Sequence, residues 1–258
     1  MQVLAVQTDI VWEEPQANFD RVTAMLAQAR PQPGDLVVLP EMFAWGFSMN
    51  TARVTEDEDG PTATFLAETA RRLDLTMVGG VPLRHQPRPR NAVLVYSPTG
   101  RVVRYDKRRP FTFGEEGHHY EPGRQAVWFQ WNGFRVAPLI CYDLRFPELF
   151  RELALDHEID MFVVPANWPS PRVEHWQALL KARAIENQAV VVGVNRCGQD
   201  PSNPYPGCSM MIDEQGRVVA EAGSEPVVLR ASFGLDHLRA YRQRFPALVD
   251  GRSLRSSL

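Results

Sequence analysis

Short apolar segments alternate with segments of helical periodicity along the whole chain. Every residue of Ala189–Val194 is apolar, as is typical of a strand buried on both faces. Directly before it, Val173–Asn187 places four apolar side chains on one face of a helix. By the same criteria we predict helices at 15–29, Ala63–Leu73 and Pro147–His157, and strands at Val3–Val6, Leu36–Leu39, Met77–Val81, Met161–Val164 and Val227–Ala231.

Other strand-like segments are close enough in sequence to form hairpins. The predicted pairs are Asn91–Tyr96 with Arg101–Tyr105, Gln125–Trp131 with Phe134–Ile140, and Cys208–Asp213 with Arg217–Ala220. Helices thus alternate with paired strands, and no linker divides the chain. We therefore expect one α/β domain over residues 1–258, a four-layer α-β-β-α sandwich of two sheets covered by outer helices. Its last part, from about 245 to 258, is predicted to be a polar tail.

The composition argues against several classes of partner. The 258 residues carry a net charge of -3 without a basic block, which argues against nucleic acid or an anionic membrane as a partner. The apolar segments are far shorter than the roughly 20 residues of a membrane-spanning helix. The first ten residues read as a strand rather than a signal peptide. Three cysteines without disulfide spacing fit reduced thiols, so we expect a cytoplasmic protein.

Three residues of different chemistry follow three of the predicted strands. They are Glu41 in LVVLPEMF, Lys107 in RYDKRRPF and Cys141 in APLICYDLRFPE. Strand ends are where α/β enzymes carry their chemistry, so these side chains are candidates for an active site. Taken one at a time, each has a structural explanation: a loop charge, a member of a solvated basic cluster, and a small core residue.

Together, a carboxylate, an ammonium and a thiol can cleave a carbon–nitrogen bond through a thioester. A thiol becomes a strong nucleophile only after losing its proton, and a carboxylate such as Glu41 can accept it. The same carboxylate can return the proton to the leaving amine. The oxyanion of the tetrahedral intermediate can be stabilised by the Lys107 ammonium and by the backbone N–H of Tyr142, directly after Cys141.

Other chemistry for the cysteines fits the sequence less well. A papain-like pair of Cys141 with His118 or His119 would have the histidine before the cysteine, and no asparagine or aspartate partner is evident. A metal site built from these histidines with Cys197 and Cys208 lacks both C-x-x-C and H-x(3–5)-H spacing. No glycine-rich nucleotide fingerprint is present. We therefore expect no metal site.

Four separated blocks of the sequence resemble the nitrilase superfamily of carbon–nitrogen hydrolases. The blocks are LPEMFAWGFSM, YDKRRPF, LICYDLRFPELFR, and ANWP followed by ARAIENQAVVVGVNR. The resemblance runs from about Val3 to about Val228 and is greatest to the omega-amidase branch. That branch hydrolyses the terminal amide of α-keto acid amides such as 2-oxoglutaramate. The resemblance implies the same sandwich fold and the same roles for Glu41, Lys107 and Cys141.

The resemblance also implies features that the residues alone do not indicate. Members use no metal or organic cofactor, and their protomers pair through the sandwiches, so we expect no cofactor and a homodimer. A second glutamate holds the lysine and helps to orient the substrate. In FTFGEEGHHYEPG both Glu115 and Glu116 are available, and the position relative to Tyr120 and Pro122 favours Glu116.

Residues near the nucleophile are interpreted as scaffold or as pocket wall. Arg145 and Glu148 occur throughout the family, and we interpret them as an ion pair or cap that shapes the turn at the cysteine. Asp143 is assigned to the same scaffold. Asn167 and Trp168, at the end of the next strand, are predicted to form the wall of the substrate pocket.

The substrate itself is a small amide, with water as the second reactant. Arg172 is a candidate for binding its distal carboxylate, because a planar guanidinium fits a carboxylate. The same three catalytic groups also suit a nitrilase or an N-carbamoyl amide hydrolase. A non-catalytic binding protein on this fold is the alternative of a different class, but such proteins lose a member of the trio, and here all three are present.

Overall fold

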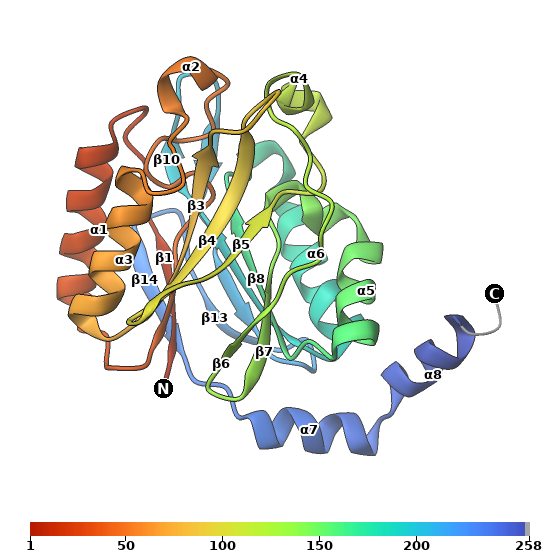
Figure 1. The fold of residues 1–258 in the computed structure, drawn as a ribbon. Helices are drawn as coiled ribbons and strands as arrows, with labels where there is room; N and C mark the ends of the chain where they lie inside the picture. The colour runs from red at the N-terminus through yellow and green to blue at the C-terminus, as the bar shows by residue number, and fades with distance from the viewer. Residues whose placement is uncertain (256–258) are drawn as a thin grey trace.

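The computed structural model describes residues 1–255 and has four layers (Figure 1). Two six-stranded sheets lie face to face, and helices cover their outer sides, as expected. The strand order of the first sheet is β14 (Val227–Ala231), β1 (Val3–Gln7), β2 (Leu36–Val38), β3 (Thr76–Leu83), β4 (Arg90–Ser97) and β5 (Gly100–Asp106). The order of the second is β13 (Val218–Glu221), β12 (Met210–Ile212), β9 (Val190–Asn195), β8 (Met161–Ala166), β7 (Phe134–Pro138) and β6 (Phe129–Trp131).

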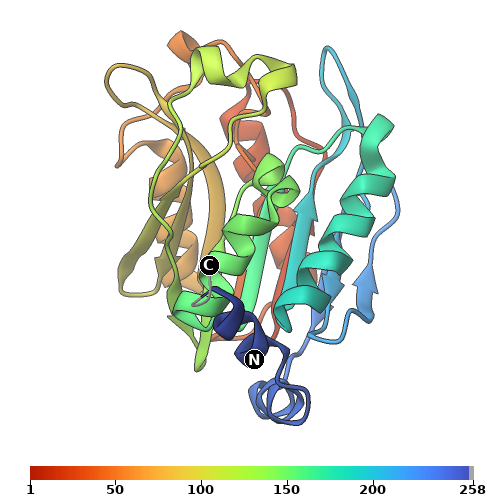
Figure 2. The same cartoon turned by 90° about the vertical axis from the view of Figure 1, so that its right-hand side faces the viewer.

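Helices cover the two sheets from opposite sides (Figures 1 and 2). The first sheet is covered by α1 (Pro15–Ala29) and α3 (Pro61–Leu73), and the second by α5 (Pro147–His157) and α6 (Val173–Asn187). At one end of the sandwich lie α2 (Thr51–Val54), α4 (Glu116–His119) and the hairpin of β10 (Cys197–Gln199) and β11 (Pro204–Pro206). At the other end lie α7 (Leu235–Arg244) and α8 (Ala247–Arg255).

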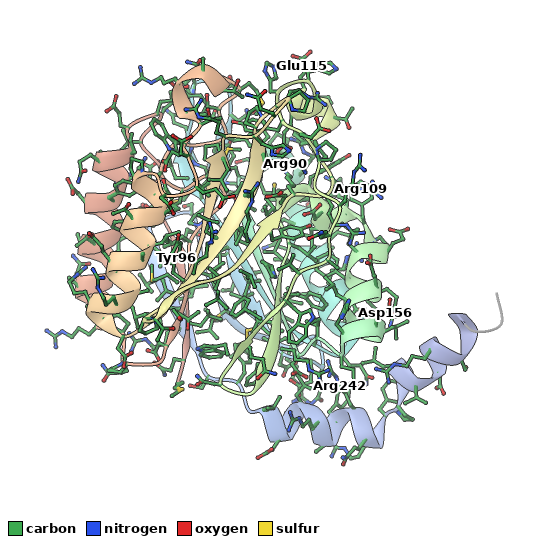
Figure 3. All side chains as sticks on the ribbon, viewed as in Figure 1. Arg90, Tyr96, Arg109, Glu115, Asp156 and Arg242 are labelled. Carbon is green, nitrogen blue, oxygen red and sulfur yellow. The ribbon has the colours of Figure 1, made fainter. Side chains whose placement is uncertain are left out.

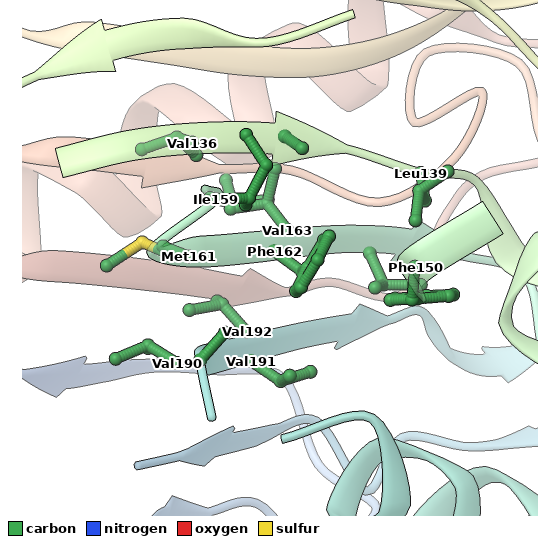
Figure 4. Packing of buried hydrophobic residues seen from close by; sticks show 14 of the residues in the cluster. Val136, Leu139, Phe150, Ile159, Met161, Phe162, Val163, Val190, Val191 and Val192 are labelled. Atoms are coloured by element: carbon green, nitrogen blue, oxygen red, sulfur yellow. The ribbon is translucent and has the colours of Figure 1, made fainter. Parts of the chain in front are cut away.

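Side chains of β1 point alternately to the two faces of the first sheet, and both faces are buried. Val3 and Ala5 belong to the hydrophobic cluster that extends between the sheets, whereas Leu4 and Val6 belong to the cluster beneath α1 and α3. In the second sheet, strands β7, β8 and β9 contribute side chains such as Phe162 to the larger cluster (Figure 4). Strands with two buried faces are uniformly apolar, which is the pattern seen in the sequence.

The pairing directions bring several strand ends to the same end of the sandwich. Strands β1, β2 and β3 are parallel, and β5 runs in their direction because it pairs antiparallel with β4, which pairs antiparallel with β3. Strands β7, β8 and β9 are also parallel to one another. The loops after β2 and β5 therefore leave one edge of the first sheet together.

Two expectations about the elements were wrong in part. The strand expected at Gln125–Trp131 begins only at Phe129, and its partner ends at Pro138 rather than Ile140. Residues 125–128 have no strand to pair with, because the chain leaves the sheet after Pro138 to form the turn at the cysteine. The polar tail expected after 245 is the helix α8 as far as Arg255, with Leu248 buried; residues 256–258 lie outside the described part.

Candidate active site

The three candidate residues follow β2, β5 and β7, and the fold brings them together. Glu41 is completely buried, Lys107 is 2% exposed and Cys141 is 8% exposed. The loop that carries Glu41 lies directly against Gly80 of β3. A Cβ atom at Gly80 would lie 2.6 Å from the Glu41 Cα, so this close approach needs glycine.

Lys107 lies between two buried carboxylates. Its Nζ donates to Glu41 Oε1 at 2.8 Å and to Glu116 Oε2 at 2.8 Å. Asn91, at the start of β4, bridges the same two carboxylates, because its Nδ2 donates to Glu41 Oε1 at 2.7 Å and to Glu116 Oε1 at 2.8 Å. The backbone N–H of Phe111 also donates to Glu116, at 2.5 Å. The four side chains form one closed, buried polar network.

The charge of Lys107 is fixed by its two neighbours. Burial alone lowers the pKa of this ammonium, but the carboxylates of Glu116 and Glu41 outweigh burial and raise the pKa above its usual value. Lys107 is therefore a permanent cation at neutral pH. It can stabilise negative charge but cannot serve as a base.

Of the two adjacent glutamates, Glu116 is the one in this network. It is fully buried on α4 and contacts Lys107 through both carboxylate oxygens. Glu115 has a left-handed backbone (φ 57°), and its side chain is exposed at the rim of the molecule (Figure 3). The geometry therefore agrees with the choice of Glu116.

Cys141 begins a tight 3-10 turn, Cys141–Arg145, which is separated from the end of β7 by Leu139 and Ile140. Its φ of 44° lies in the left-handed region, which is uncommon and strained for a residue with a side chain. Its Sγ donates to the Asn167 carbonyl oxygen at 3.7 Å. The backbone N–H of Tyr142 lies in the first turn of this short helix, where N–H groups lack an intrahelical acceptor.

Asp143 fixes the cysteine turn to the loop that carries the lysine. Its Oδ2 accepts hydrogen bonds from the Ile140 N–H at 2.9 Å and the Tyr105 hydroxyl at 2.7 Å. Its Oδ1 accepts one from the N–H of Arg109 at 2.8 Å, in the segment after β5 (Figure 3). Complete burial nevertheless raises the pKa of Asp143 to about 6. These contacts match the scaffold role expected for this residue.

Asn167 joins the loops of Glu41 and Cys141, a role that the sequence did not indicate. Its backbone N–H donates to Glu41 Oε2 at 2.9 Å, and its side-chain amide donates to the Glu41 carbonyl at 2.6 Å. Its own carbonyl accepts the Cys141 thiol. Asn167 therefore holds the carboxylate and the thiol in a fixed relation, in addition to lining the pocket.

The surroundings of Cys141 keep its sulfur protonated at rest. Burial and the negative charge of Glu41 raise the pKa of the thiol well above its usual value, and the charge of Lys107 only partly opposes them. The thiol must therefore give its proton to a base during attack. Within residues 1–255 the sulfur makes no hydrogen bond to a histidine, and the carboxylate that acts most strongly on it is Glu41, so a papain-like pair is not formed.

The sequence of the chain matches that of a known protein family. The sequence pattern of the family described as carbon-nitrogen hydrolase matches residues 2–243. The chain belongs to the carbon-nitrogen hydrolase family. The predicted resemblance to the nitrilase superfamily is thereby confirmed, and with it the assignment of the chain as a hydrolase.

Named relatives and solved structures resemble this hydrolase over nearly its whole length. Omega-amidase YafV of Yersinia enterocolitica is 39% identical, covering 97% of this chain and 96% of the relative. The 2-oxoglutaramate amidase of Bacillus subtilis (strain 168) is 32% identical, covering 97% of each chain. The crystal structure of XC1258 from Xanthomonas campestris, a CN-hydrolase superfamily protein, superposes with a TM-score of 0.90 at 38% identity, covering 97% of this chain and 96% of that one.

A pocket of about 300 Å³ opens next to the Cys141 thiol of the hydrolase. Aromatic side chains form much of its wall, among them Phe111, Tyr142 and Trp168. Trp168 is also fixed by a hydrogen bond from its ring Nε1 to the Arg172 carbonyl at 2.7 Å. This volume lies at the lower end of the range for small-molecule pockets, so it suits a small ligand.

Arg145 belongs to this pocket, and our expectation that it pairs with Glu148 was wrong. Within residues 1–255 no ion pair joins the two, and the Arg145 guanidinium lies 4.8 Å from the centre of the Trp168 ring. Its Nη2 is 3.3 Å from Nδ1 of His175. Burial and the nearby charge of Arg172 lower the pKa of Arg145. Nothing in the residue pattern around Arg145 distinguished it from the scaffold residues.

Arg172 lies in the same wall and completes a strongly basic pocket. Its guanidinium lies 5.4 Å and 5.5 Å from the ring centres of Phe111 and Phe113. In the described part of the chain, neither Arg172 nor Arg145 forms an ion pair with a carboxylate. Two guanidinium groups in one small pocket favour an anionic ligand.

The one aspartate in the pocket wall has both of its carboxylate oxygens in hydrogen bonds within the β10–β11 hairpin. Asp200 Oδ1 accepts hydrogen bonds from the backbone N–H groups of Ser202 and Asn203, both at 2.7 Å. Its Oδ2 accepts one from the Tyr205 hydroxyl at 2.6 Å. Asp200 therefore shapes the β10–β11 hairpin.

The described residues show neither a metal cluster nor a membrane span. Among residues 1–255 no three His, Cys, Asp or Glu side chains gather in a way that could hold a metal ion. No helix in the same part of the chain is long and apolar enough to cross a membrane.

Proposed function

We propose that the protein hydrolyses the terminal amide of omega-amides of α-keto dicarboxylic acids, such as 2-oxoglutaramate, to the dicarboxylate and ammonia. The observation that carries the proposal is the basic pocket beside Cys141, with its two guanidinium groups that pair with no carboxylate in the described residues. The names of the relatives from Yersinia enterocolitica and Bacillus subtilis support the same substrate class.

In the first half of the reaction, a thioester forms and ammonia leaves. Glu41 accepts the proton of the Cys141 thiol while the sulfur attacks the amide carbon. The Lys107 ammonium and the N–H of Tyr142 stabilise the oxyanion that results. Glu41 then returns the proton to the amide nitrogen, the C–N bond breaks, and ammonia departs.

In the second half, water resolves the thioester. Glu41 takes a proton from a water molecule, and the hydroxide attacks the thioester carbon. The C–S bond breaks, the proton passes from Glu41 back to the sulfur, and the dicarboxylate leaves. Glu116 keeps Lys107 in place throughout, so that the cation stays directed at the oxyanion position.

The distal end of the substrate is bound by arginines. Arg172 and Arg145 donate hydrogen bonds to the carboxylate and keto oxygens of an α-keto acid, and Trp168 and Asn167 form the wall between them and the thiol. A charge-assisted hydrogen bond contributes about 1.5–3 kcal/mol, so a substrate without the carboxylate is bound more weakly by a factor of about 10–100.

Arg172→Ala tests this assignment. We expect kcat/KM for 2-oxoglutaramate to fall about 10–100-fold. The loss should come mainly through a higher KM, because the hydrogen bond from Arg172 to the substrate carboxylate is present both before and during the reaction. A neutral short-chain amide should be hydrolysed at an unchanged rate. The matched control is Arg71→Ala on the exposed side of α3. Equal losses on both substrates would show that Arg172 does not bind the carboxylate.

Three further aspects belong to this proposal. Residues 1–258 form one catalytic domain, which is supported by the match of the family over residues 2–243. The enzyme works in the cytoplasm, which is supported by three free cysteines. It forms a homodimer, which is supported by exposed apolar side chains such as Phe245 and Val249 near the C-terminus. Sedimentation at the mass of a single chain would refute the dimer.

A further inference from the structure

Asn91 contacts every member of the buried charged network through its carboxamide or its backbone carbonyl. Its Nδ2 donates to Glu41 Oε1 at 2.7 Å and to Glu116 Oε1 at 2.8 Å, and its backbone carbonyl accepts the N–H of Lys107 at 2.8 Å. Asn91 is only 2% exposed. These contacts are made by one residue of β4, one strand away from Lys107 in the sheet.

The orientation of this amide follows from its neighbours. Both side-chain hydrogens of Asn91 point to carboxylate oxygens, whereas its Oδ1 is buried without a hydrogen-bond partner. The flipped amide would place that oxygen against Glu41 and Glu116, which is repulsive. A buried acceptor without a partner costs free energy, so the arrangement is retained for the two hydrogen bonds that it makes to the carboxylates.

These hydrogen bonds stabilise the charged forms of two acids that otherwise repel one another. Glu41 and Glu116 share one ammonium, that of Lys107, in a site almost closed to water. Two close carboxylates with a single cation tend to retain a proton, and donors such as an amide N–H oppose this.

We propose that Asn91 is a positioning residue that holds Glu41 in its ionised form, ready to accept the thiol proton. The inference rests on the proposed role of Glu41 as base. Asn91 touches neither the sulfur nor the substrate, so its effect passes entirely through the carboxylates.

The titratable groups facing this network identify what a pH profile would report. Besides the two glutamates these are Lys107 after β5, Cys141 in its turn, and Tyr120 after α4. Burial raises the pKa of Tyr120 and of Cys141, and the two carboxylates raise that of Lys107 in spite of its burial. Asp143 interacts with Lys107 as well, and burial raises the pKa of Asp143 to about 6, so an acid limb is assigned to the glutamate pair only where it moves on replacement of Glu116.

Asn91→Ala is the test, with kcat/KM for 2-oxoglutaramate measured against pH. We expect the acid limb to move up by about one pH unit, so that activity falls about tenfold below the limb and much less on the alkaline side. Adding Glu116→Gln to this variant should move the limb back down, because it removes the repelling charge. The matched control is Asn187→Ala, which deletes a buried amide on α6 whose Nδ2 donates to the Arg183 carbonyl.

Two features keep the test decisive. The isosteric Asn91→Asp replaces the donor with a third carboxyl group and should move the limb at least as far, so it serves if the alanine variant does not fold. The rate of Cys141 alkylation by iodoacetamide against pH needs no substrate and should shift in the same direction. If the wild-type protein releases no ammonia, the proposed function fails while the alkylation profile still tests Asn91. An unmoved limb in both variants, with activity either unchanged or lowered equally at every pH, would overturn the inference.

Discussion

Replacing Cys141 with alanine is expected to abolish ammonia release from 2-oxoglutaramate and to leave the fold intact. The sulfur supplies the only covalent bond to the substrate in the proposed reaction, and no neighbouring group can replace it. Its single hydrogen bond, to the Asn167 carbonyl at 3.7 Å, contributes little to stability. Ammonia assays together with thermal unfolding would measure both effects.

Cys208→Ala is the matched control for this variant. Cys208 is half-buried, and its sulfur likewise donates only to a backbone carbonyl, that of Pro206 at 3.5 Å. Its removal should leave the rate unchanged. Turnover by Cys141→Ala near the rate of the control would refute the thioester mechanism.

Glu41→Gln is expected to lower kcat by about 10²–10⁴-fold, the usual contribution of a general base. The change keeps the shape of the side chain but removes proton transfer. One oxygen of Glu41 faces the Lys107 ammonium and the other faces the N–H of Asn167. In either orientation of the glutamine amide, its NH2 group therefore lies against a donor. KM should change much less than kcat, because Glu41 does not bind the distal end of the substrate.

Two observations would separate this role from a purely structural one. The pH dependence of the remaining activity should change in Glu41→Gln, because the proposed base is gone. Glu115→Gln, an exposed neighbour of the network, should retain wild-type activity and serves as the control. A Glu41→Gln variant with wild-type kcat would rule out Glu41 as the base.

The resting state of the site explains why both residues are needed together. Burial and the charge of Glu41 raise the pKa of Cys141, so the sulfur is a thiol until substrate binds. A neutral thiol beside a carboxylate is stable in a closed pocket, and proton transfer is then coupled to attack on the amide. The adjacent Lys107 cation lowers the energy of the negative charge as it forms on the oxygen.

The parts of the site that sequence could predict are those attached to strand ends. Glu41, Lys107 and Cys141 each follow an apolar run, and the family blocks around them added Glu116. Asn91 could not be found in this way: it begins a strand, and its two carboxylate partners lie 50 and 25 residues away in the chain. Its function exists only after β4 and β5 have paired.

Arg145 and Asn167 were predicted with the wrong or an incomplete role for a related reason. Arg145 lies in a helical turn near Glu148, which favoured an ion pair as the expectation, but the guanidinium instead lies against the Trp168 ring in the pocket wall. Asn167 contacts Glu41 through both its backbone N–H and its side-chain amide, and it contacts Cys141 through its backbone carbonyl. A contact made by a backbone group does not depend on the residue type, so the sequence does not reveal it.

The fold followed from periodicity where both faces of a strand are buried, and less well elsewhere. Ala189–Val194 and Val173–Asn187 were predicted almost to the residue, because burial dictates their composition. The short elements around the pocket, α2, α4 and the β10–β11 hairpin, were not predicted. They are fixed by single contacts such as the hydrogen bond from the Tyr120 hydroxyl to the Ser48 carbonyl rather than by a repeating pattern.

The most direct test of the account is ammonia release from 2-oxoglutaramate, measured beside L-glutamine, an aliphatic nitrile and an N-carbamoyl amino acid. We predict that kcat/KM is highest for 2-oxoglutaramate by at least about tenfold, since an α-keto acid presents its oxygens to Arg145 and Arg172 without a cationic amino group. Preferred turnover of the nitrile or the carbamoyl compound, or no turnover of any of the four, would contradict the account.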